Sequence, residues 1–200
     1  MRIRVQTPSA EIEFIVRCIC VETTEILRFF DMPHFESLCK EGCSNYGKKW
    51  SCPPFAPEFS EFTSSYKYLY IFVLHTEMNQ FSYIKNDYLK VKAANSILKS
   101  RMDKTLRILS LTQGGYISTG SCRMCKPCKC KLNMPCAHRE KMSYSFEALG
   151  IDVGNMTECF LGHTLLWYKK GNLPSYTSVV GGLLMNQEAD AQNLEKCFCT

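Results

Sequence analysis

The sequence has no long hydrophobic run, and its longest apolar stretch, residues 68–74, is seven residues. A transmembrane helix needs roughly 18 or more consecutive apolar residues, so no membrane span is expected. The first twenty residues also lack the apolar region and the small-residue cleavage site of a secretory signal. We therefore expect a soluble, cytoplasmic protein whose cysteines are kept reduced.

The sequence also lacks the short motifs of several common enzyme classes. It contains no G-x-S-x-G motif, no phosphate-binding loop and no dinucleotide fingerprint. A nicotinamide enzyme is therefore a poor interpretation. Histidines are few, and His34, His75 and His163 stand alone beside apolar residues, which favours roles in packing or at the surface. His138 follows Cys136 by two residues and is a candidate metal ligand or hydrogen-bond donor.

Cysteine, in contrast, is abundant: the chain of 200 residues contains thirteen, an odd number. Cys122, Cys125 and Cys128 form a C-x-x-C-x-x-C motif, and Cys136 follows after seven intervening residues. This spacing is typical of segments that bind a 4Fe-4S cluster. Zinc sites usually leave a dozen or more residues between two cysteine pairs. We therefore expect a 4Fe-4S cluster here, with zinc as the alternative.

A second group of three cysteines lies within residues 35–55. Cys39 and Cys43 are four residues apart, so they would be neighbours on one face of a short helix. The Gly- and Pro-containing turn over residues 45–54 would then bring Cys52 back beside them. Three thiols are one short of a closed four-cysteine site. We expect the fourth position to be open or filled by a group other than cysteine.

The basic residues are concentrated around the C-x-x-C-x-x-C motif, within a net charge of +5. Between residues 122 and 141 one acid stands against six basic residues: Arg123, Lys126, Lys129, Lys131, Arg139 and Lys141. A cluster held by four thiolates is an anion, so these cations would stabilise it and favour an acidic redox protein partner. A solvated loop is the simpler interpretation. Nucleic acid is a weaker one, because no aromatic residues alternate with the charges.

The hydrophobic pattern predicts three long elements. Alternation over residues 12–20 indicates a half-buried strand with Cys18 and Cys20 facing the core. The apolar run over residues 68–74 is rich in aromatic and β-branched residues, which predicts a central strand buried on both faces. From Asn86, an expected N-cap, apolar residues recur every three or four positions up to residues 114–115. One long helix should therefore cover the sheet.

Shorter elements are predicted in the rest of the chain. Residues 116–119 should form a strand that leads into the cysteine motif, and residues 144–149 a short helix that ends at Gly150. Residues 164–169 and 176–184 should be the strands of a hairpin. The last dozen residues should form a polar helix and a frayed tail. These elements predict a single α+β domain over residues 1–200, with a mixed α/β arrangement as the alternative, and cysteine-rich loops that bind metal clusters.

Further residues stand at fixed spacing around both cysteine groups. They are Tyr46-Gly47, Trp50-Ser51-Cys52-Pro53-Pro54, Gly120, Pro135, His138 and Ser145-x-Glu147-x2-Gly150-Ile151-Asp152-Val153. With these motifs, over roughly residues 39 to 153, the chain resembles a family of predicted metal-binding, cysteine-rich proteins of unknown function, known mostly from anaerobic bacteria and methanogens. The resemblance implies seven metal ligands: Cys39, Cys43, Cys52, Cys122, Cys125, Cys128 and Cys136. It leaves Cys130 as an extra thiol and implies no reaction.

Three functions are compatible with these residues. The first is an iron-sulfur protein, with one or two 4Fe-4S clusters, that transfers electrons or supports a redox enzyme. The second is a structural zinc-binding or nucleic-acid-binding module. The third is an enzyme that binds its substrate at an open iron of the three-cysteine site. The sequence identifies neither a substrate nor a reaction, so catalysis stays an open question.

Overall fold

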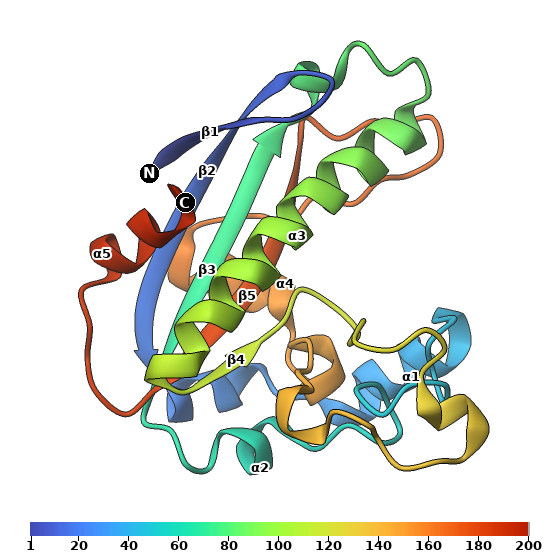
Figure 1. The fold of residues 1–200 in the computed structure, drawn as a ribbon, viewed down its shortest axis with the longest axis vertical. Helices are drawn as coiled ribbons and strands as arrows, with labels where there is room; N and C mark the ends of the chain where they lie inside the picture. Colours follow the sequence, from blue (N-terminus) through green and yellow to red (C-terminus); the bar gives the residue numbers. More distant parts are fainter. Residues whose placement is uncertain (200) are drawn as a thin grey trace.

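The computed structural model describes residues 1–199, which form a five-stranded antiparallel sheet with helices packed on it (Figure 1). The strand order is β1-β2-β3-β5-β4. The strands are β1 (Arg2–Gln6), β2 (Glu11–Glu22), β3 (Tyr68–Glu77), β4 (Gly115–Ile117) and β5 (Tyr176–Met185). The α-helices are α1 (Met32–Gly42), α2 (Phe59–Thr63), α3 (Asp87–Gln113), α4 (Val153–Leu161) and α5 (Ala191–Lys196). The short 3-10 helices are η1 (Thr23–Phe29), η2 (Met78–Phe81), η3 (Lys129–Leu132), η4 (Arg139–Lys141), η5 (Glu147–Leu149) and η6 (Cys197–Cys199). The predicted α+β class is confirmed.

Strand β3 is the middle strand, and both of its faces are buried. Its backbone pairs with β2 on one side and with β5 on the other. Leu69, Ile71 and Val73 contribute to one hydrophobic core, whereas Tyr70 and Phe72 contribute to the core on the opposite face. The apolar run over residues 68–74 is therefore the central strand, as the sequence predicts.

Helix α3 covers one face of the sheet (Figure 1). It begins at the expected N-cap, where the Asn86 side chain accepts a hydrogen bond from the Leu89 N–H at 3.0 Å. Met102 and Leu106 pack closely on β5, because that strand carries Gly181, where an added Cβ would lie 2.7 Å from Leu106 Cδ1. In the described part of the chain, neither this helix nor any other is long and apolar enough to cross a membrane.

The C-terminal segment packs on the same face of the sheet as α3. Leu194 of α5 and Phe198 of η6 are buried in that core, and the Phe198 ring lies 5.3 Å from the Phe72 ring between centroids. The prediction of a frayed tail is therefore wrong up to residue 199, because a buried aromatic side chain anchors the chain end. Thr200 lies outside the described residues.

The opposite face of the sheet is covered by several short elements. Ile26 of η1, Phe59 of α2, Leu149 of η5 and Met156 of α4 are fully buried there. Helices α2 and α4 span only 5 and 9 residues, so they are too short to be recognised by periodicity alone. The predicted helix over residues 144–149 is reduced to the 3-10 turn η5, which ends at Gly150 with φ +82°.

The predicted hairpin over residues 164–184 is wrong in its first strand. Residues 164–169 pair with no strand within residues 1–199, and an isolated bridge joins Lys169 to Asn172. Strand β5 pairs with β3 and β4 instead. Trp167 is 69% exposed, so the apolar residues of this segment do not mark a buried strand face. The predicted strand over residues 116–119 is confirmed only as far as residue 117.

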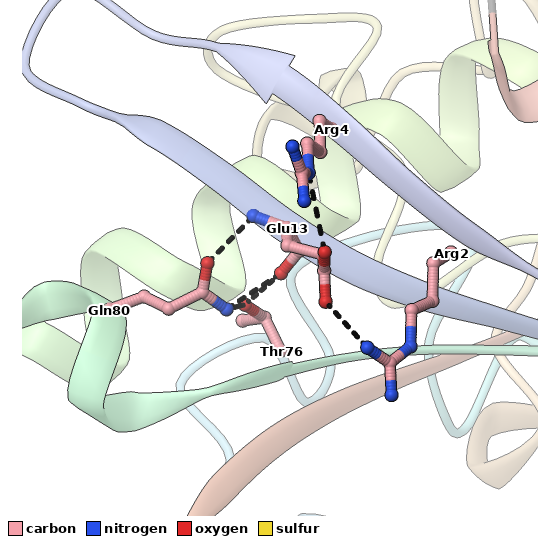
Figure 2. Close-up of polar contacts among 5 residues, drawn as sticks. All are labelled: Arg2, Arg4, Glu13, Thr76 and Gln80. Atoms are coloured by element: carbon pink, nitrogen blue, oxygen red, sulfur yellow. Dashed lines mark hydrogen bonds and ion pairs between the residues drawn. The ribbon is translucent and has the colours of Figure 1, made fainter.

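Polar contacts fix the edge of the sheet where β1 pairs with β2, as Figure 2 shows. The Glu13 carboxylate lies between Arg2 and Arg4, at 3.6 Å from Arg2 Nη1 and 3.4 Å from Arg4 Nε. The Gln80 amide accepts a hydrogen bond from the Glu13 N–H at 2.7 Å and donates to the Glu13 carbonyl at 2.8 Å. Thr76 Oγ1 donates to the same carbonyl at 2.8 Å. These side-chain contacts hold β2 to the end of β3 and to η2 beyond the last pair of the β2–β3 ladder, Ile15 and His75.

Candidate metal centre

The first cysteine group lies at the C-terminal end of α1. Asp31 caps the start of this helix, because its Oδ1 accepts a hydrogen bond from the His34 N–H at 3.1 Å. Cys39 lies in the last turn, and Cys43 is the C-cap, whose N–H donates to the Cys39 carbonyl at 3.0 Å. The two thiols interact directly, as expected for residues four apart on one helix face.

Residues 44–55 turn back and place Cys52 beside these two thiols. Gly47 stands at the turn with φ +64°, and its N–H donates to the Pro53 carbonyl at 3.0 Å. Cys52 is 7% exposed, and the charges of Cys39 and Cys43 both act on its thiol. The structure therefore brings all three members of the first group together.

The second cysteine group lies on the long loop that follows β4. The start of this loop is held by the rest of the fold, because the Ser118 N–H donates to the Tyr144 carbonyl at 2.8 Å. The next residue is held by α3, since the Thr119 N–H donates to Asp103 Oδ1 at 2.9 Å. The C-x-x-C-x-x-C motif thus begins from a fixed point beside the sheet.

Hydrogen bonds dock the two cysteine segments on each other, and Figure 1 shows both at the same end of the molecule. Ser51 Oγ accepts a hydrogen bond from the Cys122 N–H at 2.9 Å. Lys49 Nζ donates to Ser121 Oγ at 2.8 Å and to the Cys122 carbonyl at 2.9 Å. These contacts join the neighbours of Cys52 directly to the first residue of the C-x-x-C-x-x-C motif.

Two further contacts extend this docking along the loop. Trp50 Nε1 donates to the Met134 carbonyl at 2.9 Å, and Cys130 Sγ donates to the Gly47 carbonyl at 3.8 Å. Cys130 is 5% exposed, so this extra thiol faces the first segment rather than solvent. The docking contacts join residues 71 to 84 positions apart, and no local sequence pattern indicates them.

Tyr144 lies near both ends of the second cysteine group. Burial raises the pKa of its phenol; the charge of Arg139 lowers it, and the charges of Cys136 and Cys122 raise it. Because Cys122 and Cys136 act on the same phenol, the loop returns close to its starting point. Tyr144 also packs edge-on against Phe62, with ring centroids 5.0 Å apart, which ties this part of the loop to α2.

The thiols of the first group lie in surroundings that favour their protonated form. Burial raises the pKa of Cys39, and the charges of Cys43 and Glu147 raise it further. Burial raises the pKa of Cys52 to about 11, although the hydrogen bond with Ser51 lowers it. A bound metal cation would reverse this preference, because it stabilises thiolates and displaces their protons. The chemistry of these donors therefore fits a thiophilic metal.

The donors nevertheless form no ready-made site for a single ion. Among residues 1–199, no three side chains of His, Cys, Asp or Glu are grouped closely enough to hold one. No cysteine in this range forms a disulfide. The seven expected ligands therefore lie on two docked segments. The charges of Cys39 and Cys43 act on Cys52, but neither group has the geometry of a single-ion site among residues 1–199.

The other candidate residues have separate positions. His138 is half-buried beside the second group. The His75 and His163 rings pack against each other, with centroids 4.9 Å apart, and both are buried in the core. Glu147 acts on Cys39 through its charge, and Asp152 caps α4 by accepting a hydrogen bond from the Asn155 N–H at 3.0 Å.

Comparison with known proteins relates most of this chain to one family model. The model, described as "Predicted metal-binding protein (DUF2284)", matches residues 27–185. The matched range includes both cysteine segments and every docking contact between them. No curated protein and no solved structure gives a significant match.

Proposed function

The chain belongs to this family of predicted metal-binding proteins, and from that premise we propose that it is an iron-sulfur protein. In this proposal it binds one or two 4Fe-4S clusters and either transfers electrons or supports a redox enzyme. One cluster would be held by Cys122, Cys125, Cys128 and Cys136. The other would be held by Cys39, Cys43 and Cys52, with a fourth position that is open or filled by a group other than cysteine. When bound, such clusters supply one-electron redox chemistry.

The observation that carries this proposal is the docking of the two cysteine segments. The Cys122 N–H donates to Ser51 Oγ at 2.9 Å, so the first residue of one group contacts the neighbour of Cys52 in the other. Lys49 reinforces this contact and brings a positive charge to the junction. A cation at this point would stabilise anionic clusters on either side of it.

Zinc is the alternative metal, and the spacing of the cysteines along the sequence supports a cluster over zinc. Cys122, Cys125 and Cys128 are separated by two residues each, as in segments that bind a 4Fe-4S cluster. Zinc sites usually leave a dozen or more residues between two cysteine pairs.

The surface beside the second cysteine group supports an acidic redox protein as the partner. Leu132 and Met134 are 55% and 47% exposed on this loop. Exposed basic residues stand around them in the sequence: Arg123, Lys126, Lys131, Arg139 and Lys141. Charges of one sign around an apolar patch speed association with an oppositely charged partner. Redox clusters of this kind also call for a reducing compartment, so the proposal places the chain in the cytoplasm.

Metal content of matched cysteine variants tests the proposal. Cys125→Ser should lose metal and soluble expression together, because ligands that close a loop around a metal supply folding energy. Cys199→Ser is the control, since that thiol is exposed at the chain end, and it should keep the full metal content. Equal metal content in the two variants would contradict the ligand assignment. Zinc without acid-labile sulfide in both would favour the structural zinc module or the nucleic-acid-binding module.

A further inference from the structure

A cavity of about 470 Å³ opens between the two docked cysteine segments. The first segment contributes Trp50 and Phe55 to its wall, and the second contributes Pro135, Cys136 and Met142. This volume is within the range of about 300–1,000 Å³ that is usual for small-molecule sites. The cavity therefore lies directly beside Cys136, one of the expected cluster ligands.

Three aromatic side chains, Trp50, Phe55 and Tyr144, line the cavity, and contacts with neighbouring residues hold them in place. The Trp50 and Phe55 rings pack with centroids 4.7 Å apart and an interplanar angle of 58°. The Trp50 ring, which lines the cavity, is held by its hydrogen bond to the Met134 carbonyl at 2.9 Å. Tyr144 lines the cavity as well, and its ring is fixed by packing against Phe62. Preformed aromatic walls suit a flat apolar molecule, because little order is lost when it binds.

The cavity also has one strongly polar feature, the Arg139 guanidinium. Among the residues that line the cavity, Arg139 is the one basic side chain, and no carboxylate is among them. Asn133 adds a neutral amide to the same lining. A guanidinium beside an apolar wall pairs well with a carboxylate, since it can donate two parallel hydrogen bonds.

We propose that this cavity binds a small planar molecule with one carboxylate or similar anionic group, which lies with its ring against Trp50 and its charge on Arg139. Its role as a substrate site rests on the proposed iron-sulfur function, because the molecule would then lie beside the cluster held through Cys136.

Calorimetric titration of the full chain, purified without oxygen, tests the proposal with two probes of nearly equal shape. The charged probe is 2-naphthoate, and the uncharged one is 2-naphthalenemethanol. Wild-type protein should bind 2-naphthoate more tightly. Arg139→Gln should weaken 2-naphthoate binding by about tenfold or more, because a charged hydrogen bond is lost, and should leave 2-naphthalenemethanol binding unchanged. Phe55→Ala should weaken binding of both probes, because it removes part of the apolar wall.

Arg123→Gln is the matched control. Arg123 is an exposed arginine of the same loop that does not line this cavity, so its loss should not change the affinity of either probe. Equal affinity of wild-type protein for the two probes, equal loss in Arg123→Gln and Arg139→Gln, or no binding of either probe would overturn the proposal. Thermal unfolding of each variant shows whether it is folded.

Metal analysis of the same samples separates the two proposals. If 2-naphthoate binds through Arg139 but the protein contains no iron, the cavity assignment holds and the iron-sulfur function fails. If the protein contains iron and sulfide but neither probe binds, the iron-sulfur function holds and the cavity assignment fails.

Discussion

Acidification should destabilise the fold through His75, a histidine in the central strand. The side chain is 7% exposed, and its Nδ1 is buried with no hydrogen-bond partner in the described structure. Its ring packs against His163 and Tyr176, with centroids 4.9 Å and 5.6 Å away. Burial lowers the pKa of His75 from 6.5 to about 4, and the positive charges of His163 and Arg17 add to this effect. His75 is therefore neutral in the folded protein near neutral pH.

The lowered pKa sets the sign and size of the effect. Between pH 6.5 and pH 4 the unfolded chain binds a proton at His75 and the folded chain does not, so acid favours unfolding. Above pH 6.5 His75 is neutral in both states, so the free energy of unfolding keeps its full value there. The free energy of unfolding then decreases as the pH falls from 6.5 toward 4. At about 1.36 kcal/mol for each pKa unit, the difference between 6.5 and about 4 is worth about 3 kcal/mol.

Urea unfolding at several pH values across this range measures the effect. As the pH falls, the free energy of unfolding of His75→Phe should rise relative to wild type by about 3 kcal/mol. His34→Gln, a change at an exposed histidine, should follow the wild type. Any effect of acid on bound metal is common to the three proteins and cancels in the comparison. If the free energy of unfolding of His75→Phe falls as steeply as that of the wild type when the pH is lowered, the reasoning is refuted.

Three further predictions concern other parts of the chain. Gly114→Ala should cost about 3 kcal/mol or more, seen in urea unfolding, because φ is +143° and the new Cβ would lie 2.0 Å from the Leu184 carbonyl oxygen. Phe198→Ala should lower the free energy of unfolding by about 3 kcal/mol, because the ring is fully buried. Cys130→Ser should keep about eight irons per chain, whereas Cys52→Ser should fall toward about four, the arithmetic of two four-iron clusters.

Each of these predictions has a control. Gly171→Ala also places a side chain at positive φ, but nothing lies within 4 Å of it, so it should cost only about 1 kcal/mol. Leu111→Ala removes a side chain that is 81% exposed and should change stability by less than about 0.5 kcal/mol. If Gly114→Ala costs no more than Gly171→Ala, the close contact with Leu184 is absent. If Phe198→Ala costs no more than Leu111→Ala, the burial of Phe198 is absent. Loss of a whole cluster in Cys130→Ser would show that the division into four and three ligands is wrong.

Local sequence patterns predict the elements whose burial is regular along the chain. The apolar run over residues 68–74 predicts β3, because a central strand buries both faces and needs no alternation. The residues Leu98 and Met102 of α3 are spaced so that each helical turn meets the sheet. Asn86 marks the start of this helix through a hydrogen bond that depends only on neighbouring residues.

The same patterns fail where the partner of a segment is distant in the sequence. Residues 176–185 pair with β3 and β4, so their hairpin-like neighbours at 164–169 are left without a strand to pair with. The sequence pattern assigns Phe198 to a polar tail, but the fold brings Phe72 beside it. Both outcomes are decided by tertiary contacts, which local propensity does not encode.

In the candidate metal centre, too, some features follow from the local sequence and others depend on contacts between distant segments. The contact between Cys39 and Cys43 follows from their spacing on one helix, and the return of Cys52 follows from the turn that precedes it. The contacts of Lys49 and Ser51 with residues 121–122 do not follow from the sequence, because they join segments more than 70 positions apart. The cavity beside Cys136 is lined by residues of both docked segments, so no local sequence pattern indicates it either.

The iron and acid-labile sulfide content of the wild-type protein, purified without oxygen, tests the central claim most directly. Two clusters predict about eight irons and about eight sulfides per chain, and a single cluster predicts about four of each. The protein should also be brown, with visible absorption that bleaches on reduction. Colourless protein with stoichiometric zinc and no acid-labile sulfide would contradict the account.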